Sequence, residues 1–332
     1  MFEKLKQMFR NYTIENGVLK EYSGGKCSFK VPYGVTRIGK RAFKSYYSGT
    51  KKLTKVYLPE TVVAIEDEAM IKCNIREITI PEGVTYIGCS AFSECKLVEI
   101  KLPNSLSEIG EKAFVACSNL KSLTIPGGVE IIKPYTFTGC SGLKYVKLSE
   151  GIKKIEESAF SGCSSLEEVI LPEGLEIIDR GAFLKCSKIK KAVLPKTVKK
   201  IGFAAFAECS SLEEAILPEG LEIIDQGAFM KCSKIKKVVL PTTVKKIEVG
   251  AFSECCSLEE LVIPEGLEII GAGAFSKCSN LKKVVLPMTV KIIEQKAFEC
   301  CAALKEVVAP ADARVMPLAF ENCNIDKITP VK

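Results

Sequence analysis

The stretch "LPEGLEIIDRGAFLKCSKIKKAVLP", residues 171–195, returns almost unchanged as "LPEGLEIIDQGAFMKCSKIKKVVLP", residues 217–241. The prolines that end these stretches belong to a series with a step of 22 or 23 residues, in which Ser149 fills one place. The series consists of Pro59, Pro81, Pro103, Pro126, Pro172, Pro195, Pro218, Pro241, Pro264, Pro287 and Pro310. A fixed period of this length is the signature of a solenoid, in which each turn buries its apolar face against the next copy.

Each turn follows the pattern L-x-x-V-x-L-P-x-G-L-x-x-I-x-x-x-A-F-x-x-C-x-x. The V-x-L segment alternates like a short half-buried strand, and proline ends it because proline cannot donate to a ladder. The Pro-Glu-Gly segment turns the chain, and "GAFMKCS" is expected to return as a short helical or 3-10 turn with Phe229 inside. The predicted fold is a repeat solenoid, α/β or mainly β, of about thirteen turns with a parallel β-ladder spaced at about 4.8 Å.

The pattern, with Ala-Phe and Cys at these offsets from the proline, closely resembles the BspA-like class of leucine-rich repeat proteins over about residues 32–330. The resemblance implies a bacterial or protist recognition scaffold associated with cell adhesion and protein binding. It also implies no catalysis, no cofactor and a cell-surface or secreted location. The class has no fixed binding residue that can be carried over to this sequence.

Composition excludes several chemistries independently of that resemblance. The 332 residues contain no histidine and no tryptophan, so every mechanism that uses imidazole as a base or metal ligand is excluded. None of the glycine-rich phosphate loops or nucleophile motifs is placed as its chemistry requires. The hydrophobic content of 47% supports a large core, and no apolar run reaches the length of a membrane-spanning helix. We therefore predict a folded, non-enzymatic protein without a membrane span.

Charge alternates from turn to turn. The two positions after the leading Leu or Ile read Glu167-Glu168, Lys190-Lys191, Glu213-Glu214, Lys236-Lys237, Glu259-Glu260 and Lys282-Lys283. In a parallel stack identical turns would place like charges about 4.8 Å apart, whereas alternation places opposite charges there. The pattern also argues against nucleic acid as a partner, because a phosphate backbone requires an unbroken basic track.

Twelve of the sixteen cysteines occupy one slot, three residues after the phenylalanine of each turn. They are Cys73, Cys95, Cys117, Cys140, Cys163, Cys186, Cys209, Cys232, Cys255, Cys278, Cys301 and Cys323. Because no C-x-x-C occurs, metal sites are not expected, and the slot predicts a ladder of reduced, buried thiols that behave as small apolar groups. Cys27, Cys89, Cys256 and Cys300 lie outside the slot. So many thiols favour a reducing compartment, and with the missing export signal they suggest the cytoplasm.

The residue between Val and Leu of each strand should point away from the core. In the first turns it is polar or aromatic, but from Ile170 onward it is always a β-branched aliphatic residue. This candidate binding face comprises Ile170, Val193, Ile216, Val239, Val262, Val285 and Val308, flanked by Glu168, Lys191, Glu214, Lys237, Glu260 and Lys283. The face is interpreted either as a contact surface for a protein partner or as a ladder in which β-branched residues simply pack well.

The two ends depart from the repeat. Residues 1–31 are expected to form an N-terminal cap with a short amphipathic helix and a hairpin around Asn16-Gly17, ahead of a solenoid over 32–332. A loop with Tyr46 and Tyr47 is a secondary contact candidate. The chain stops at "IDKITPVK" without a polar closing helix, so weak homo-oligomerisation is expected. A protein-interaction scaffold is the leading functional interpretation, and a structural scaffold that self-associates through its C-terminal turns is the alternative.

Overall fold

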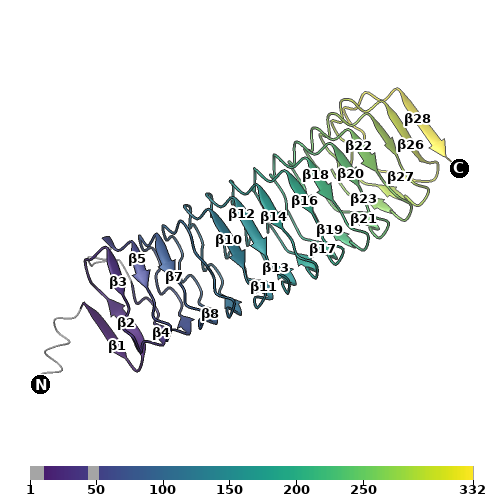
Figure 1. The fold of residues 1–332 in the computed structure, drawn as a ribbon. Coiled ribbons are helices and arrows are strands. Elements are labelled where there is room, and N and C mark those ends of the chain that lie inside the picture. Colours follow the sequence, from purple (N-terminus) through teal and green to yellow (C-terminus); the bar gives the residue numbers. More distant parts are fainter. Residues whose placement is uncertain (1–10, 44–51, 332) are drawn as a thin grey trace, which may run out of the picture. The chain divides into compact units, whose positions relative to one another are not determined.

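The computed structural model describes residues 11–43 and 52–331, which divide between two compact units, Met1–Ile152 and Lys153–Lys332. Both units consist of short strands joined by turns, as Figure 1 shows, and no α-helix occurs among the described residues. The predicted repeat solenoid with parallel strands is therefore confirmed, with about thirteen turns of about 23 residues in the chain as a whole.

The first unit begins with an antiparallel hairpin of β1 and β2, whose turn has Asn16 and Gly17 at positive φ. In this unit the strands are β1 Tyr12–Glu15, β2 Val18–Tyr22, β3 Ser28–Lys30, β4 Arg37–Ile38, β5 Lys55–Tyr57, β6 Ala64–Ile65, β7 Glu77–Thr79, β8 Tyr86–Ile87, β9 Glu108–Ile109, β10 Ser122–Ile125, β11 Ile131–Ile132 and β12 Tyr145–Leu148. β2 continues in parallel through β4, β6, β8 and β9, while β3, β5 and β7 form a second ladder. The hairpin therefore lies on the first turn of the solenoid.

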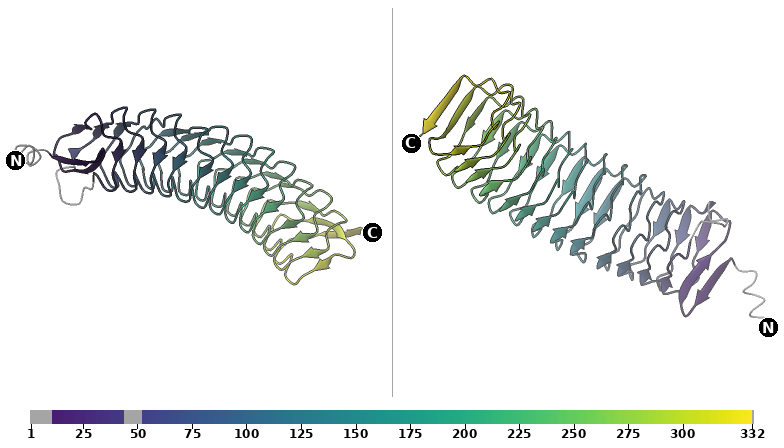
Figure 2. Two further views of the ribbon diagram at one scale, coloured as in Figure 1. Left: turned by 90° about the horizontal axis from the view of Figure 1, so that it is seen from below. Right: turned by 180° about the vertical axis from the view of Figure 1, so that it is seen from behind.

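In the second unit each turn contributes one strand to each of two ladders, seen from two further directions in Figure 2. The first ladder contains β14 Glu168–Ile170, β16 Lys191–Val193, β18 Glu214–Ile216, β20 Lys237–Val239, β22 Glu260–Val262, β24 Lys283–Val285, β26 Glu306–Pro310 and β28 Lys327–Val331. The second contains β13 Lys154–Ile155, β15 Ile177–Ile178, β17 Lys200–Ile201, β19 Ile223–Ile224, β21 Lys246–Ile247, β23 Ile269–Ile270, β25 Ile292–Ile293 and β27 Arg314–Val315.

Hydrogen-bonded neighbours in the first ladder pair without a register shift. Val193 lies opposite Ile216, and Val239 lies opposite Val262, one turn apart in each case. Continuous hydrogen bonding joins β16 to β22 and then β24 to β28. A residue that points outward in one turn is therefore stacked on its equivalent in the next, because side chains alternate between the two faces of a strand.

The segments that return the chain after the second ladder, such as "GAFLKCS" at residues 181–187, are successions of turns. They are not the helical or 3-10 turns expected from the sequence. Alternate backbone N–H groups of a return donate to carbonyl groups of the next turn. Phe183 N donates to Ala205 O at 2.7 Å, and Lys185 N donates to Ala207 O at 2.9 Å. Two positions in each return that is described in full also adopt left-handed backbone, such as Gly181 at φ 57° and Lys185 at φ 61°. A right-handed helix cannot continue through such residues, so the return becomes a third ladder between turns.

The phenylalanines of the returns form the centre of the core. Rings on successive turns stack nearly parallel, with centroids 5.2 Å apart for Phe92–Phe114 and 5.3 Å apart for Phe229–Phe252. In the second unit the stack runs unbroken from Phe160 to Phe320. Buried aromatic rings supply a large share of the apolar area removed from water, so this stack anchors each return to its neighbours.

The proline turns alternate between two kinds, and they interlock. The Pro-Glu-Gly turn at 172–174 places Gly174 at φ 95°, whereas the following Pro-Lys-Thr turn has no residue at positive φ. The Thr197 hydroxyl accepts a hydrogen bond from Gly174 N at 3.0 Å and donates to Leu175 O at 2.8 Å. Thr289 repeats both contacts with Gly266 and Leu267 four turns later. The repeat of two turns therefore rests on hydrogen bonds to the backbone of the proline turns as well as on the alternation of charge.

Several sequence-based expectations fall outside the described residues. The short amphipathic helix expected at the start belongs to residues 1–10, and the loop with Tyr46 and Tyr47 belongs to residues 44–51. The division into a cap of residues 1–31 and a solenoid of residues 32–332 stays a prediction.

Replacing Thr197 by Val should lower the free energy of unfolding by about 1 to 3 kcal/mol, because Gly174 N and Leu175 O both lose a partner in a half-buried turn. Thr197→Ser is the matched control: it keeps the hydroxyl and loses one methyl group, at a cost of at most about 0.8 kcal/mol. Urea denaturation of the three proteins measures the difference. Equal losses in both variants would show that packing of the methyl group, and not the interlock, holds the turn.

Candidate binding face

The aliphatic stripe predicted from the sequence, residues Ile170 to Val308, lies wholly within the second unit. Six of its members are 41 to 52% exposed: Ile170, Val193, Ile216, Val239, Val262 and Val285. Val308 is half-buried, and Thr329 of β28 lies beside it in register. The residues on either side along each strand point inward, as with the buried Val238 and Leu240. The stripe is thus a single row of exposed apolar side chains that crosses the strands.

One flank of the stripe is electrically neutralised by pairs of opposite charge on neighbouring turns. Lys191 Nζ lies 2.8 Å from a Glu214 carboxylate oxygen, and Lys237 Nζ lies 2.6 Å from Glu260. Lys283 and Glu306 repeat the arrangement at 3.0 Å. The expected stacking of opposite charges is confirmed in these pairs. Each exposed pair contributes only about 0.2 to 1 kcal/mol, so its larger effect is to avoid a column of like charges.

On the other side of the stripe the surface is hollowed. A hollow of about 650 Å³ is bordered by Val193 and Ile216 of the stripe, by Pro195 and Pro218 behind them, and by the exposed carboxylate residue Glu219. The prolines form part of its wall because they end the strands of this ladder. An apolar row beside a hollow with a charged rim can contact a segment of another protein chain.

In the first unit the corresponding face is polar. Tyr57 is the exposed aromatic residue of β5, and the ammonium groups of Lys30 and Lys55 lie 5.7 and 5.4 Å from the centroid of its ring. Lys55 also pairs with Glu77 of the next strand at 2.6 Å. The two faces therefore differ in chemistry although the same backbone presents them.

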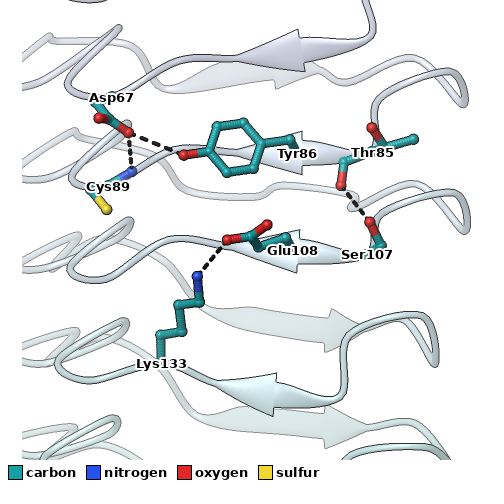
Figure 3. Close-up of polar contacts among 7 residues, drawn as sticks. All are labelled: Asp67, Thr85, Tyr86, Cys89, Ser107, Glu108 and Lys133. Carbon is teal, nitrogen blue, oxygen red and sulfur yellow. Dashed lines mark hydrogen bonds and ion pairs between the residues drawn. The ribbon is translucent and has the colours of Figure 1, made fainter.

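Polar groups on or just after strands β6, β8, β9 and β11 of the first unit form contacts between turns, as Figure 3 shows. Asp67 accepts hydrogen bonds from Tyr86 Oη at 3.2 Å and from Cys89 N at 2.8 Å, and Lys133 pairs with Glu108. Burial, reinforced by the Asp67 charge, raises the pKa of Tyr86 to about 12. Each of these side chains has a partner on a neighbouring turn, which is the arrangement of a structural network.

A second hollow on the second unit was not foreseen from the sequence. It measures about 540 Å³ and lies over the returns, where Gly227, Gly250 and Gly273 replace larger residues at the left-handed position. The repeated glycine in "DQGAF", "EVGAF" and "GAGAF" is the signal that could have revealed it. The N–H groups of these glycines all donate to the next turn, so hydrogen bonding to a ligand would depend on polar side chains of the lining such as Gln226 and Gln295.

The cysteine slot is a ladder of thiols bonded to backbone. At least eleven of the twelve Sγ atoms donate to the carbonyl of the residue in the phenylalanine slot one turn earlier, for example Cys209 to Phe183 O at 3.2 Å. The donors are Cys73, Cys95, Cys117, Cys140, Cys186, Cys209, Cys232, Cys255, Cys278, Cys301 and Cys323. Burial raises the pKa of the Cys73, Cys117 and Cys209 thiols to about 12.

Neither metal chemistry nor a membrane span has support in the described part of the chain. Residues 11–43 and 52–331 contain no group of three or more Cys, Asp or Glu side chains placed to hold a metal ion. Within the same residues no helix is long and apolar enough to cross a membrane.

A comparison with protein families matches the chain to the BspA type leucine-rich repeat region (six copies), over residues 13–142, 107–236 and 199–327. The stacked parallel strands, the proline turns and the phenylalanine-cysteine returns define a leucine-rich repeat solenoid. The chain belongs to the BspA-type leucine-rich repeat family. This family consists typically of non-enzymatic binding scaffolds. A comparison with curated proteins gave no match.

Solved bacterial structures share the fold over nearly the whole chain. A leucine-rich repeat protein from Bacteroides ovatus is 28% identical with a TM-score of 0.74, and the match covers 97% of this chain and 98% of that one. A leucine rich cell surface protein from Faecalibacterium prausnitzii is 25% identical, with a TM-score of 0.57 and coverage of 97% and 93%. The pneumococcal vaccine antigen PcpA, 19% identical with a TM-score of 0.55 and 97% coverage of both chains, is alike in fold.

The buried ladder thiols, from Cys73 to Cys301, should be unreactive in the native protein. At pH 8 a thiol reagent should modify the exposed Cys27, Cys89 and Cys256 quickly, while these buried thiols should react only after denaturation, because the thiolate is the reactive form. Rapid modification of the ladder in the folded protein would contradict this prediction.

The buried thiols of Cys73, Cys117 and Cys209 predict loss of stability in alkali. The folded pKa of these three thiols, about 12, lies above the ordinary value of 9.0, so their contribution is complete below about pH 9 and declines as the pH rises toward 12. The free energy of unfolding, measured by denaturation between pH 7 and pH 11, should be flat at first and then fall.

Proposed function

We propose that this chain is a non-enzymatic scaffold that recognises another protein through the strand face of its second unit. The observation that carries the proposal is the exposed stripe from Ile170 to Val285, because an apolar residue occupies the outward position of every strand in it. Lys or Thr at these positions would serve solubility better, as the outward Thr79 and Lys101 do in the first unit.

The surroundings of the stripe support recognition over simple packing. The paired charges on one flank and the hollow on the other combine an apolar centre with a polar rim, which is the anatomy of a protein interface. The likeness to a bacterial cell surface protein of the same fold is consistent with a binding role. A stripe only one side chain wide fits a segment of a partner and not a broad surface.

Replacing Val239 and Val262 together by Lys should abolish partner binding and leave the fold intact, because both side chains point outward while Leu240 and Phe252 hold the core. Chemical cross-linking in a native lysate, followed by mass spectrometry, identifies proteins captured by the native chain and lost in the variant.

Ile223→Lys is the matched control for this variant. Ile223 is also a strand residue with an exposed aliphatic side chain, but it belongs to the other ladder of the same unit. It should retain every partner that the native chain captures. A double stripe variant that is folded and still captures the same proteins at the same level would overturn the assignment of the face.

We further propose that the chain works in a reducing compartment such as the cytoplasm. Three free thiols, Cys27, Cys89 and Cys256, are exposed, and exposed thiols persist where the environment keeps them reduced. A membrane-impermeant thiol reagent applied to intact host cells should leave the protein unlabelled and should label it after lysis. Labelling of intact cells would instead place it at the cell surface.

A further inference from the structure

A second column of exposed residues, four of them charged, borders the aliphatic stripe on the side of the hollow. It consists of the exposed residue after the proline of each turn: Glu173, Lys196, Glu219, Thr242, Glu265 and Met288. Among the described residues no ion pair forms at these positions, in contrast to the paired charges on the opposite flank. The column therefore carries three carboxylates against one ammonium group and forms an acidic edge along the stripe.

The acidic edge and the stripe belong to one surface. The hollow between them is lined both by Val193 and Ile216 of the stripe and by two carboxylate residues of the edge, Glu173 and Glu219, with Lys196 between them. Glu219 and Glu265 are held in place by the next turn, because Thr242 N donates to Glu219 at 3.1 Å and Met288 N donates to Glu265 at 3.4 Å. The carboxylates are thus fixed while they keep capacity for a further hydrogen bond.

The spacing of the stripe and edge residues favours an α-helix as the secondary structure of the bound partner segment. Apolar residues recur at every turn, about 4.8 Å apart, and the carboxylates recur at every second turn, about 9.6 Å apart. An α-helix has a pitch of about 5.4 Å and places residues i and i+7 about 10.5 Å apart, so both of its spacings lie near those of the surface. Same-side residues of an extended strand are about 6.6 to 6.8 Å apart and match neither spacing.

A polyproline II segment matches only one of the two spacings. It repeats about every 9.3 Å and could follow the carboxylates, but it presents an apolar residue on one face only once in that length. Half of the stripe would then remain uncovered, whereas an α-helix covers the stripe at every turn. Because the edge is acidic, the side of the helix that faces it should be basic.

We propose, on the basis of the strand-face function above, that the partner segment is a basic amphipathic α-helix lying across the strands of the first ladder of the second unit. Its apolar side chains contact the stripe and enter the hollow beside Val193 and Ile216. Its Lys or Arg residues, seven apart in sequence, pair with Glu173, Glu219 and Glu265. Because the charges on the opposite flank already form ion pairs with one another, the acidic edge sets the orientation of the helix.

Three synthetic 18-residue peptides test the proposal by fluorescence anisotropy with the full chain. The first places Leu along one helical face and Lys at positions i, i+7 and i+14 beside it. The second has the same composition in strict apolar-polar alternation, and the third replaces the three Lys by Glu. The basic helical peptide should bind at least tenfold more tightly than the alternating peptide and at least fivefold more tightly than the Glu peptide, with the second difference shrinking at high salt.

Charge variants of the protein provide the matched control. Glu219→Lys with Glu265→Lys should reverse the order of the Lys and Glu peptides. Glu219→Gln with Glu265→Gln, which keeps an acceptor for the N–H groups of the next turn, should bind the two peptides within twofold of each other. Circular dichroism confirms that each variant is folded.

The outcomes separate this proposal from the function on which it rests. Equal binding of the three peptides, or a preference for the alternating peptide, overturns the helix while the strand face stands. The same conclusion follows if no peptide binds but Val239→Lys with Val262→Lys still loses the cellular partner. If the stripe variant keeps its partner, the face itself is wrong, and the helix proposal falls with it.

Discussion

Hydrogen bonds from the backbone of each turn to the backbone of the next govern the structure of both units. They run along two strand ladders and along the returns, where Phe183 N donates to Ala205 O. Since equivalent residues are partners in the register of the strand ladders, their side chains stand above one another. Apolar groups gain from this arrangement, and the result is the unbroken ring stack from Phe160 to Phe320. Identical charged groups would repel one another in the same arrangement, and Glu therefore alternates with Lys from turn to turn.

The two-turn period of the second unit has a further physical basis in the proline turns. A Pro-Glu-Gly turn leaves the N–H of Gly174 to be satisfied, and the Thr197 hydroxyl of the next turn accepts from it. A turn with glycine is thus completed by a turn with threonine, and the pair repeats at Gly266 and Thr289. The same alternation places Glu173, Glu219 and Glu265 at every second turn, so the backbone constraint also sets the spacing of the acidic edge.

The strand geometry separates the core from the outer face. Val238 and Leu240 are buried, whereas Val239 between them is exposed, so the outward position can change without disturbing the interior. The first unit uses that freedom for Tyr57 and charged neighbours, and the second unit uses it for a continuous aliphatic row. Bacterial structures such as the Bacteroides ovatus protein share the fold at 28% identity. Function in this fold is therefore expected to reside in the outward residues.

The sequence by itself determined the number and length of the turns, the inward and outward positions of each strand, the reduced cysteine slot and the aliphatic stripe, because in-register stacking turns a linear period directly into spatial neighbours. It did not reveal that the returns avoid helix, since left-handed backbone at a residue such as Lys185 becomes apparent only when its N–H bonds to the next turn. Nor did it distinguish the two flanks of the stripe. Glu214 is neutralised by Lys191, whereas Glu219 borders a hollow, and that difference depends on the paths of side chains between neighbouring turns, which only the tertiary structure decides.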